Sequence, residues 1–324
     1  MSVREGEIVL NNQEESLQLF GKHGELRKLI QSEIHVRIVD RGAVVSILGD
    51  SADVAIADLV LREMLDSIRG GHAPTKTDVD YVVREAKQDN ASDVGKTFLN
   101  AIKVSRGGPV VRPRTRGQQH YIEAVRKYDI VFCIGPAGTG KTYLAMAMAI
   151  RAMRQREVAR LILCRPAVEA GESLGFLPGD LEQKVNPYLR PLYDALYAMI
   201  DVDEVRKLID RDRIEVAPLA YMRGRTLDGA FIILDEGQNT SVAQMKMFLT
   251  RLGSDSKTII TGDVTQIDLP NDQMSGLVHA REILTGTKDI GFVHLNRDDV
   301  VRHKLVRDII DAYERDIADN EMVE

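Results

Sequence analysis

Tryptophan is absent from the sequence, aromatic residues make up 5% of its 324 positions, and there are just two cysteines. So few cysteines exclude the disulfide framework of a small secreted domain. Cys133 and Cys164 each stand at the end of an apolar run, where we expect small buried residues in a reducing compartment. No metal-ligand spacing connects them to the seven histidines, so the pattern does not predict a structural zinc site.

Long hydrophobic runs are also missing. No window contains the roughly 18 uncharged apolar residues that a membrane-spanning helix needs, and the acidic start of the chain does not resemble a secretory signal. We therefore expect a soluble, cytoplasmic protein with no membrane partner. Because 44% of the residues are apolar, the chain has enough material for ordinary hydrophobic cores, and its length suits two domains.

An excess of positive charge is the third feature that the sequence lacks. Its 43 lysines and arginines are outnumbered by 49 aspartates and glutamates, which gives a formal net charge of −6. A uniformly basic surface is therefore excluded, and any nucleic-acid site must be a local patch. One candidate is the connector of residues 103–116, which carries five positive charges and no acid. Its glycines and prolines fit either a solvated linker or a contact to an RNA backbone.

Three zones of the chain differ in pattern. Residues 1–70 alternate short apolar runs with helical periodicity, as a small α+β domain would. Residues 71–116 form a looser helical segment that ends in the basic connector. Residues 117–324 repeat a strand followed by a helix. We therefore expect two domains, at 1–70 and 117–324, joined by the segment between them.

The third zone predicts a parallel sheet. Six short, apolar, β-branched segments have the pattern of fully buried parallel strands. They are Ile130–Ile134, Leu161–Cys164, Ile214–Ala217, Phe231–Leu234, Thr258–Thr261 and Phe292–Leu295. Helical patterns lie between or after them, among them Thr142–Gln155, Ser241–Arg251 and Asp298–Glu314. This alternation predicts an α/β fold with helices on both faces of the sheet and a ligand site at the carboxyl ends of the strands.

One phosphate-binding motif matches G-x-x-x-x-G-K-[ST] in full, after a predicted strand and before a predicted helix. Its residues, all candidates for binding the nucleotide, are Gly135, Pro136, Ala137, Gly138, Thr139, Gly140, Lys141 and Thr142. The glycines let backbone N–H groups face a phosphate, and the helix N-terminus favours its negative charge. Lys141 is expected to bridge the β- and γ-phosphates of ATP, and the Thr142 hydroxyl to bind Mg²⁺.

Two carboxylates, Asp235 and Glu236, follow the predicted strand Phe231–Leu234 and so emerge beside the phosphate-binding loop. We expect Asp235 to hold Mg²⁺, directly or through water, and Glu236 to orient or deprotonate the attacking water. A nucleotide-dependent switch or a small-molecule kinase does not need the second carboxylate. Glu236 therefore argues for hydrolysis of ATP.

Three glutamines are candidates for contacts with ATP on the basis of weaker patterns. Gln266 follows the strand ending near Gly262-Asp263 and is a candidate sensor of the γ-phosphate, although that segment also fits an ordinary turn. Gln118 and Gln119 begin a helical segment ahead of the phosphate-binding motif. One of them, with Gln118 slightly preferred, is expected to contact the adenine edge; the alternative is an exposed glutamine at a helix start.

Taken together, these residues resemble the PhoH family of P-loop ATPases, whose ATPase domain is similar to the first motor domain of superfamily 1 helicases. The resemblance spans roughly residues 114–313. Besides the phosphate-binding motif, it includes residues 165–179, 221–227, 235–239, 262–266 and 299–303. It implies a RecA-like fold, ATP and Mg²⁺ as ligands, and a possible RNA helicase activity. By the same resemblance, the loops at 171–179 and 223–226 would contact single-stranded RNA.

We expect no second motor domain, because about sixty residues remain after Gln266 and such a domain needs about 100 or more. Helicases place ATP between two such domains, the second of which supplies arginines. We therefore predict a homo-oligomer, possibly a ring, in which a neighbouring copy donates an arginine finger. Arg302 is the first candidate and Arg297, Arg223 and Arg225 follow. Alternatively, Arg302 is a surface residue of a terminal helix.

In the first zone, a G-x-x-G loop joins two helical patterns. The predicted elements are a strand at 8–10, helices at 14–20 and 25–30, strands at 35–39 and 43–48 with a turn at 40–42 between them, and a helix at 52–68. The order β-α-α-β-β-α resembles a KH domain, which implies binding of an RNA backbone at the loop. The residues carried over are Gly21, Lys22, His23, Gly24, Arg27 and Lys28. A module kept for protein contacts is the alternative.

These patterns leave three functions in competition. The first is an ATPase coupled to RNA binding or remodelling. The second is an ATP-dependent switch that holds a protein partner, such as an endoribonuclease, without unwinding RNA. The third, a small-molecule kinase, is the least supported. No lid or acceptor pocket is apparent in the sequence, and Glu236 is expected to activate water.

Overall fold

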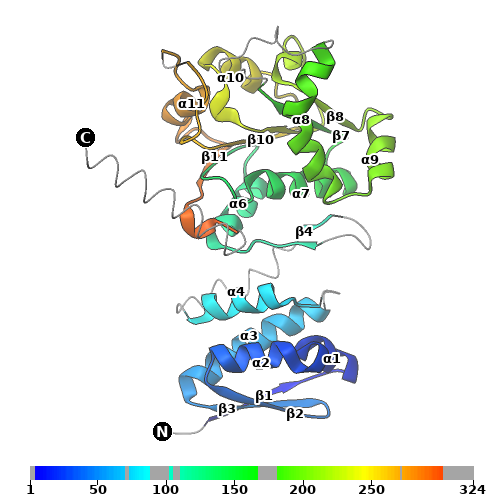
Figure 1. Ribbon diagram of the computed structural model, residues 1–324, viewed down its shortest axis with the longest axis vertical. Helices are drawn as coiled ribbons and strands as arrows, with labels where there is room; N and C mark the ends of the chain where they lie inside the picture. Colours follow the sequence, from blue (N-terminus) through cyan, green and yellow to red (C-terminus); the bar gives the residue numbers. More distant parts are fainter. Residues whose placement is uncertain are drawn as a thin grey trace, which may run out of the picture. The chain divides into compact units, whose positions relative to one another are not determined.

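The computed structural model describes residues 4–69, 73–87, 102–104, 110–166, 181–270 and 272–301. The chain forms two compact units (Figure 1). The first comprises residues 1–103 and 110–115, and the second comprises residues 104–109 and 116–324. None of the described helices combines the length and apolarity that crossing a membrane requires.

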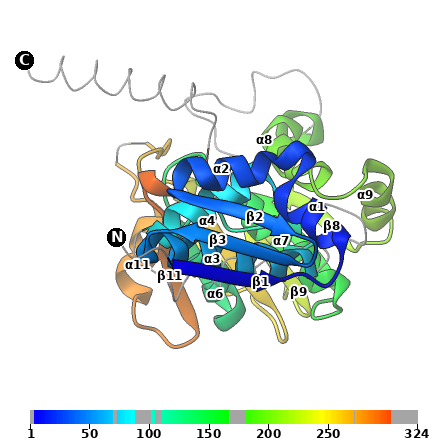
Figure 2. The same ribbon diagram turned by 90° about the horizontal axis from the view of Figure 1, so that it is seen from below.

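The first unit contains a three-stranded antiparallel sheet with helices packed on it. Its leading elements are β1 (Arg4–Val9), α1 (Gln13–Phe20), α2 (Glu25–Glu33), β2 (Val36–Arg41), β3 (Val44–Gly49) and α3 (Ser51–Arg69). The predicted order β-α-α-β-β-α is thus confirmed. Figure 2 shows the sheet face on, with β3 between β1 and β2. The turn lies at Gly42 and Ala43, slightly later than predicted, and Gly42 takes a φ of 67° that favours glycine.

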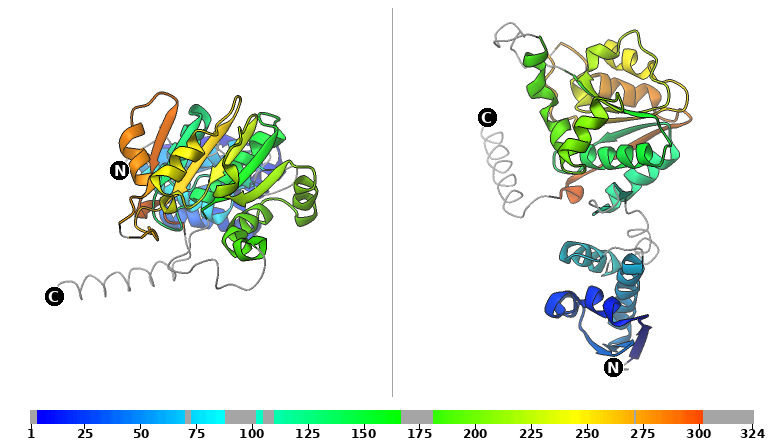
Figure 3. Two further views of the ribbon diagram at one scale, coloured as in Figure 1. Left: turned by 90° about the horizontal axis from the view of Figure 1, so that it is seen from above. Right: turned by 90° about the vertical axis from the view of Figure 1, so that its right-hand side faces the viewer.

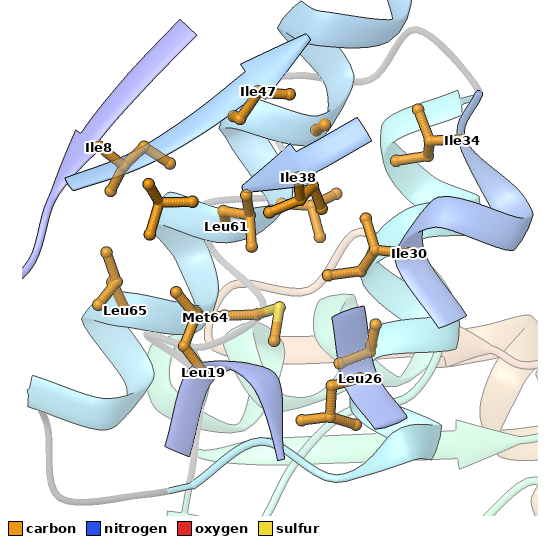
Figure 4. Packing of buried hydrophobic residues seen from close by; sticks show 14 of the residues in the cluster. Ile8, Leu19, Leu26, Ile30, Ile34, Ile38, Ile47, Leu61, Met64 and Leu65 are labelled. Atoms are coloured by element: carbon orange, nitrogen blue, oxygen red, sulfur yellow. The ribbon is translucent and has the colours of Figure 1, made fainter. Parts of the chain in front are cut away.

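Alternating burial fixes the side of the sheet that faces the helices. Val36 and Ile38 of β2 are buried while Arg37 between them is exposed, as expected for a strand with one wet face. Figure 4 shows how Ile38 and Ile47 of the sheet meet the helices, among labelled neighbours such as Leu61 and Met64 of α3. One face of α3 is therefore buried against the sheet.

A further helix, α4 (Lys76–Lys87), belongs to the same core, although the sequence of this segment predicts looser structure. It packs on α2 and α3 and buries the stripe Val79, Val82, Val83 and Ala86, the spacing of one helix face. Ion pairs join α4 to α2 at both ends, Lys76 to Glu25 at 2.8 Å and Lys87 to Glu33 at 3.0 Å. The short strands β4 (Ile102–Lys103) and β5 (Val110–Val111) form an antiparallel pair.

The second unit is built on a six-stranded parallel sheet. Its elements are α6 (Arg116–Lys127), β6 (Ile130–Ile134), α7 (Lys141–Arg154), β7 (Arg160–Arg165), α8 (Leu181–Tyr197), α9 (Val202–Ile209), β8 (Ile214–Pro218), β9 (Ala230–Leu234), α10 (Val242–Leu249), β10 (Lys257–Gly262), α11 (Gly276–Leu284) and β11 (Ile290–His294). The strand order is β11-β6-β10-β9-β7-β8, and every pairing is parallel. All six predicted strands are therefore present, with β11 shifted towards the N-terminus.

Helices cover both faces of this sheet, as the sequence predicts (Figure 3). On one face, α7 packs against β7, β9 and β10, with α6 beside it. On the other, α10 and α11 pack together over a cluster that includes Ile232, Leu234 and Ile260. The predicted helix at 298–314 lies mostly outside the described part of the chain, which ends at residue 301. The described residues there include the 3-10 turn Arg297–Asp299.

The strand order positions the functional loops. β10 lies between β6 and β9, and its register aligns Gly262 with Ile134 and Ile260 with Leu234. The carboxyl ends of these three strands therefore meet at one edge of the sheet, where ligands of parallel sheets bind.

We expect a pH-dependent contribution to stability from Glu15 of α1. Its carboxylate accepts hydrogen bonds from Arg69 Nε at 3.0 Å and from the Asn11 amide at 2.8 Å, and Arg69 is the main reason that its pKa falls to about 2. A carboxyl whose pKa is lowered by folding stabilises the folded state fully above its ordinary pKa, near 4.5, and loses this contribution as the pH falls towards 2.

The difference in Tm between wild type and Glu15→Gln should therefore be largest near neutral pH and shrink below pH of about 4.5. Circular dichroism melts between neutral and acidic pH would measure it. The exposed neighbour Glu14 is the control, since Glu14→Gln should change Tm little at any pH. A difference that does not depend on pH would contradict this account of the Glu15 ion pair.

Candidate functional site

The phosphate-binding loop connects β6 to α7 and is wrapped around the ammonium of Lys141. Lys141 Nζ donates to the carbonyl oxygens of Gly135 at 2.6 Å and Pro136 at 2.9 Å. Gly138 and Gly140 have φ angles of 84° and 79°, the left-handed region that glycine accepts without strain. Gly140 is the N-cap of α7 and makes no side-chain cap, so the first N–H groups of this helix face the loop interior. These residues fit a bound phosphate.

A pocket of about 270 Å³ lies at this loop. Its lining comes from the carboxyl ends of β6, β9 and β10, which the strand order brings together. The lining residues are Ala137, Gly138, Gly140, Lys141, Thr142, Tyr143, Asp235, Glu236, Gly262, Asp263 and Gln266. The pocket thus gathers Lys141, Thr142, Asp235, Glu236 and Gln266 with part of the phosphate-binding loop. Of the other predicted residues, Gly135, Pro136, Thr139 and Gln118 do not line it, and Arg302 lies outside the described residues.

Asp235 is one of two buried carboxylates that line the pocket; it is 6% exposed and Asp263 is 4% exposed. Asp235 Oδ1 accepts hydrogen bonds from the hydroxyls of Thr142 and Thr261, both at 2.6 Å. Carboxylate and hydroxyl oxygens are the hard ligands that Mg²⁺ prefers, and the cation usually retains waters and phosphate oxygens as further ligands. Thr142 and Asp235 therefore fit the predicted metal site, and Thr261 fixes the orientation of the carboxylate.

Glu236 lies at the rim of the pocket with a side chain that is 32% exposed. Its backbone has a φ of 54°, an uncommon value for a residue other than glycine. Each carboxylate oxygen has a donor: Oε1 lies 3.2 Å from Arg165 Nη2, and Oε2 accepts from Gln238 Nε2 at 2.6 Å. The predicted base is therefore held at both oxygens.

Gln238 joins the two loops that follow β9 and β10. Besides Glu236, its Nε2 contacts the carbonyl oxygen of Gln266 at 3.0 Å, and its Oε1 accepts from the amide of Asp263 at 3.0 Å. Gln266 Nε2 in turn donates to Asp263 Oδ2 at 3.0 Å. A Cβ at Gly262 would come within 2.8 Å of Gln238 Oε1, so glycine permits this close approach. The predicted sensor is thus linked to the predicted base through one amide.

Gln118 supports the phosphate-binding loop from outside. It is 3% exposed, and its Nε2 donates to the carbonyl oxygen of Thr139 at 2.9 Å. The alternative of an exposed glutamine at a helix start is therefore wrong. Contact with an adenine stays a prediction. Gln119 is likewise buried, at 4% exposed.

The end of the described chain also contacts the loop. The Val301 amide donates to the carbonyl oxygen of Gly138 at 3.0 Å. Asp299 is buried and accepts from the Asn296 amide at 2.9 Å, and a Cβ at Gly117 would meet its carboxylate at 2.4 Å. Segment 296–301 is thus packed tightly against the start of α6 and the loop that α6 supports.

The arginine candidates have different settings. Arg302 lies outside the described residues, as does the loop 171–179. Arg225 forms a two-bond ion pair with Glu215, at 2.6 and 2.7 Å, which ties it to β8. Arg223 is exposed. Arg297, the fourth candidate, is exposed as well, so Arg223 and Arg297 are the candidates with exposed side chains in the described part of the chain.

The G-x-x-G loop of the first unit lies between α1 and α2, as predicted. Gly21, His23 and Gly24 all have positive φ, from 55° to 72°, so the loop has a sharply curved backbone. Lys22, His23 and Lys28 are exposed. Arg27 instead pairs with Asp40 at 2.7 Å and lies over the ring of Phe20. Its charge is partly neutralised within the unit.

Four residues with contacts in or beside the site carried no assigned role in the sequence analysis: Arg165, Gln238, Thr261 and Asp299. Thr261 had a local signal, since it is a polar residue near the end of an apolar strand, beside the acid-bearing one. The others have contacts to partners that only the fold brings near. Arg165, for example, ends β7 and Glu236 follows β9, two strands that are adjacent in the sheet but distant in sequence.

Comparison with known proteins places this site in a family. The protein-family model described as PhoH-like protein matches residues 110–314 of this chain. A PhoH-like protein of Bacillus subtilis (strain 168) is 50% identical over 306 residues, 94% of this chain and 96% of that protein. A PhoH-like protein of Mycobacterium tuberculosis is 52% identical over 291 residues, 90% of this chain and 81% of that protein. Protein PhoH of Escherichia coli (strain K12) is 42% identical over 221 residues, 68% and 62% of the respective chains.

Thr261 offers a test of the metal site. Thr261→Val keeps the shape of the side chain but removes the hydrogen bond that orients Asp235. Loss of such a supporting bond typically weakens metal binding by about 10- to 100-fold. We therefore expect Mg²⁺-dependent ATP binding, measured by calorimetry at several Mg²⁺ concentrations, to require that much more Mg²⁺.

Thr258 supplies the matched control in the same strand. It is equally buried, and its hydroxyl has no hydrogen-bond partner within the described structure. Thr258→Val should leave the Mg²⁺ requirement unchanged. If both variants behave like wild type, Thr261 does not support the metal site.

Proposed function

The chain belongs to the PhoH-like protein family, a family of P-loop ATPases, and from this premise we propose that it binds and hydrolyses Mg·ATP and couples the turnover to RNA. The observation that carries the proposal is the meeting of Lys141, Asp235 and Glu236 around one pocket. A phosphate anchor, a metal-binding acid and a second acid are the parts that ATP hydrolysis needs.

Binding begins at the helix N-terminus. The N–H groups of the loop and of α7 bind the phosphates, and Lys141 exchanges the carbonyl oxygens of Gly135 and Pro136 for phosphate oxygens. Thr142 and Asp235 would hold Mg²⁺, which would neutralise charge on the phosphate oxygens. We also propose that Gln118, whose amide supports the loop at Thr139, contacts the adenine.

Hydrolysis uses Glu236. A water attacks the γ-phosphorus, the bond from that phosphorus to the bridging oxygen breaks, and Glu236 accepts the proton of the water. Gln266 senses the γ-phosphate and is linked to Glu236 through Gln238, whose Nε2 contacts the Glu236 carboxylate and the Gln266 carbonyl oxygen. In a homo-oligomer, an arginine from a neighbouring copy would complete the site by stabilising charge on the transferred phosphate.

The first unit is the RNA-binding part of the proposal. Its β-α-α-β-β-α order, its antiparallel sheet and the curved G-x-x-G loop support a KH-like fold. Lys22, His23 and Lys28 are exposed around that loop and carry the charge for phosphate contacts. Single-stranded RNA is the ligand that fits a narrow loop of this type.

Two substitutions test the ATPase. Lys141→Ala removes the phosphate anchor and should abolish detectable ATP binding. Glu236→Gln keeps the size of the side chain but removes the base, so it should bind ATP normally and hydrolyse it at least about a hundredfold more slowly. Calorimetry and phosphate release measure the two steps. A Glu236→Gln variant with the wild-type rate would refute the catalytic role.

The coupling to RNA has its own test. Changing both Lys22 and His23 to Asp should abolish binding of single-stranded RNA, measured by fluorescence anisotropy, and remove its stimulation of ATP turnover. The control changes Lys207 and Lys288, two exposed lysines of the second unit, to Asp and lowers the net charge at least as much. Equal RNA affinity in both variants would assign the contact elsewhere. ATP turnover that RNA never stimulates would favour the switch that holds a protein partner.

A further inference from the structure

Arg165 is the last residue of β7 and lies beside the acids that follow β9. The two strands pair in parallel up to Cys164 and Leu234, and the Asp235 amide donates to the Cys164 carbonyl at 2.9 Å. This register brings the Arg165 guanidinium to the carboxylate of Glu236, with 3.2 Å between Nη2 and Oε1. The ion pair is partly shielded, since Arg165 is 21% exposed.

The other half of the guanidinium binds a helix. Arg165 Nη1 donates to the carbonyl oxygen of Tyr188 at 3.1 Å, and Tyr188 belongs to α8. This helix contains Pro187 and Pro191, and a proline has no N–H for the carbonyl four residues earlier, so Pro191 leaves the Pro187 carbonyl without its helical donor. The adjacent Tyr188 carbonyl has two lone pairs and can accept from Arg165 beside any helical bond. The planar guanidinium of Arg165 thus connects α8 to Glu236, the proposed base.

The contacts hold Glu236 at both oxygens. Oε2 accepts from Gln238 while Oε1 faces Arg165. A general base must come within hydrogen-bond reach of the water that it deprotonates, which requires its carboxylate to turn towards that water. A carboxylate fixed by two donors resists this rotation. In this arrangement Glu236 is a base at rest, which means that both carboxylate oxygens are held by these donors and are not turned towards a water.

We propose that Arg165 is a positioning residue that keeps Glu236 at rest and couples it to α8. A ligand that shifts α8 draws Arg165 with the Tyr188 carbonyl, weakens the contact to Glu236 and frees the carboxylate for water. Nucleotide binding does not depend on the contact, because Arg165 does not touch the phosphate-binding loop among the contacts described. The inference rests on the proposed ATP hydrolysis and adds the element that regulates it.

The test compares wild type with Arg165→Gln and Arg165→Lys, with and without single-stranded oligouridylate. In Arg165→Gln the basal kcat should rise about fivefold, the effect of losing one partly exposed ion pair, with the affinity for Mg·ATP unchanged. Stimulation by oligouridylate should shrink by the same factor. Arg165→Lys keeps the charge but lacks the fork that reaches both partners, so it should behave like Arg165→Gln.

Arg154→Gln is the control, since it breaks a different ion pair of the same unit, to Glu204 at 2.8 Å, and should leave the basal rate unchanged. The inference is overturned if the basal kcat of Arg165→Gln equals or falls below that of wild type. A wild-type rate in Arg165→Lys would overturn the bridging role, and loss of Mg·ATP affinity in both variants would make Arg165 part of the binding site. Failure of the wild type itself to hydrolyse ATP would instead refute the proposed function.

Discussion

The backbone pairing that places β10 between β6 and β9 is the constraint on which the site depends. The phosphate-binding loop follows β6, the two acids follow β9, and Asp263 and Gln266 follow β10. Because the strands are parallel and in register, these three loops leave the sheet at the same edge. The Thr261 hydroxyl then crosses from β10 to Asp235, and Gln238 crosses from the β9 loop to the β10 loop. A slip in this register would separate Asp235 from Lys141.

Much of the second unit follows from local sequence. Strands buried on both faces are continuous apolar runs, and the phosphate-binding motif has one geometry wherever a strand precedes it and a helix follows. Lys141, Asp235 and Glu236 were predictable for this reason, and the lining of the pocket brings them together. The strand boundaries of β11 were less predictable, because its apolar pattern continues to Leu295, which is buried beyond the end of the ladder.

What local sequence could not predict are contacts between segments that the fold brings together. The Arg165–Glu236 pair depends on β7 being the neighbour of β9, and nothing within either strand specifies that order. The bond from Val301 to Gly138 joins the end of the described chain to the loop. In the first unit, the burial of α4 depends on a surface formed by α2 and α3 together. The ion pair with Asp40 partly neutralises Arg27, which therefore adds less positive charge to the loop.

The strand order also has a consequence for biosynthesis. β6 is the first strand of the parallel sheet to be made, yet its two neighbours, β10 and β11, are the last. A nascent chain on the ribosome therefore carries the phosphate-binding loop on a strand without partners until nearly the whole second unit has been synthesised. Pairing between such distant segments is slow and leaves apolar strand edges exposed in the meantime. The strand that carries the phosphate-binding loop therefore gains its partners late in the synthesis of the second unit, whereas the strands of the first unit are close in sequence and can pair earlier.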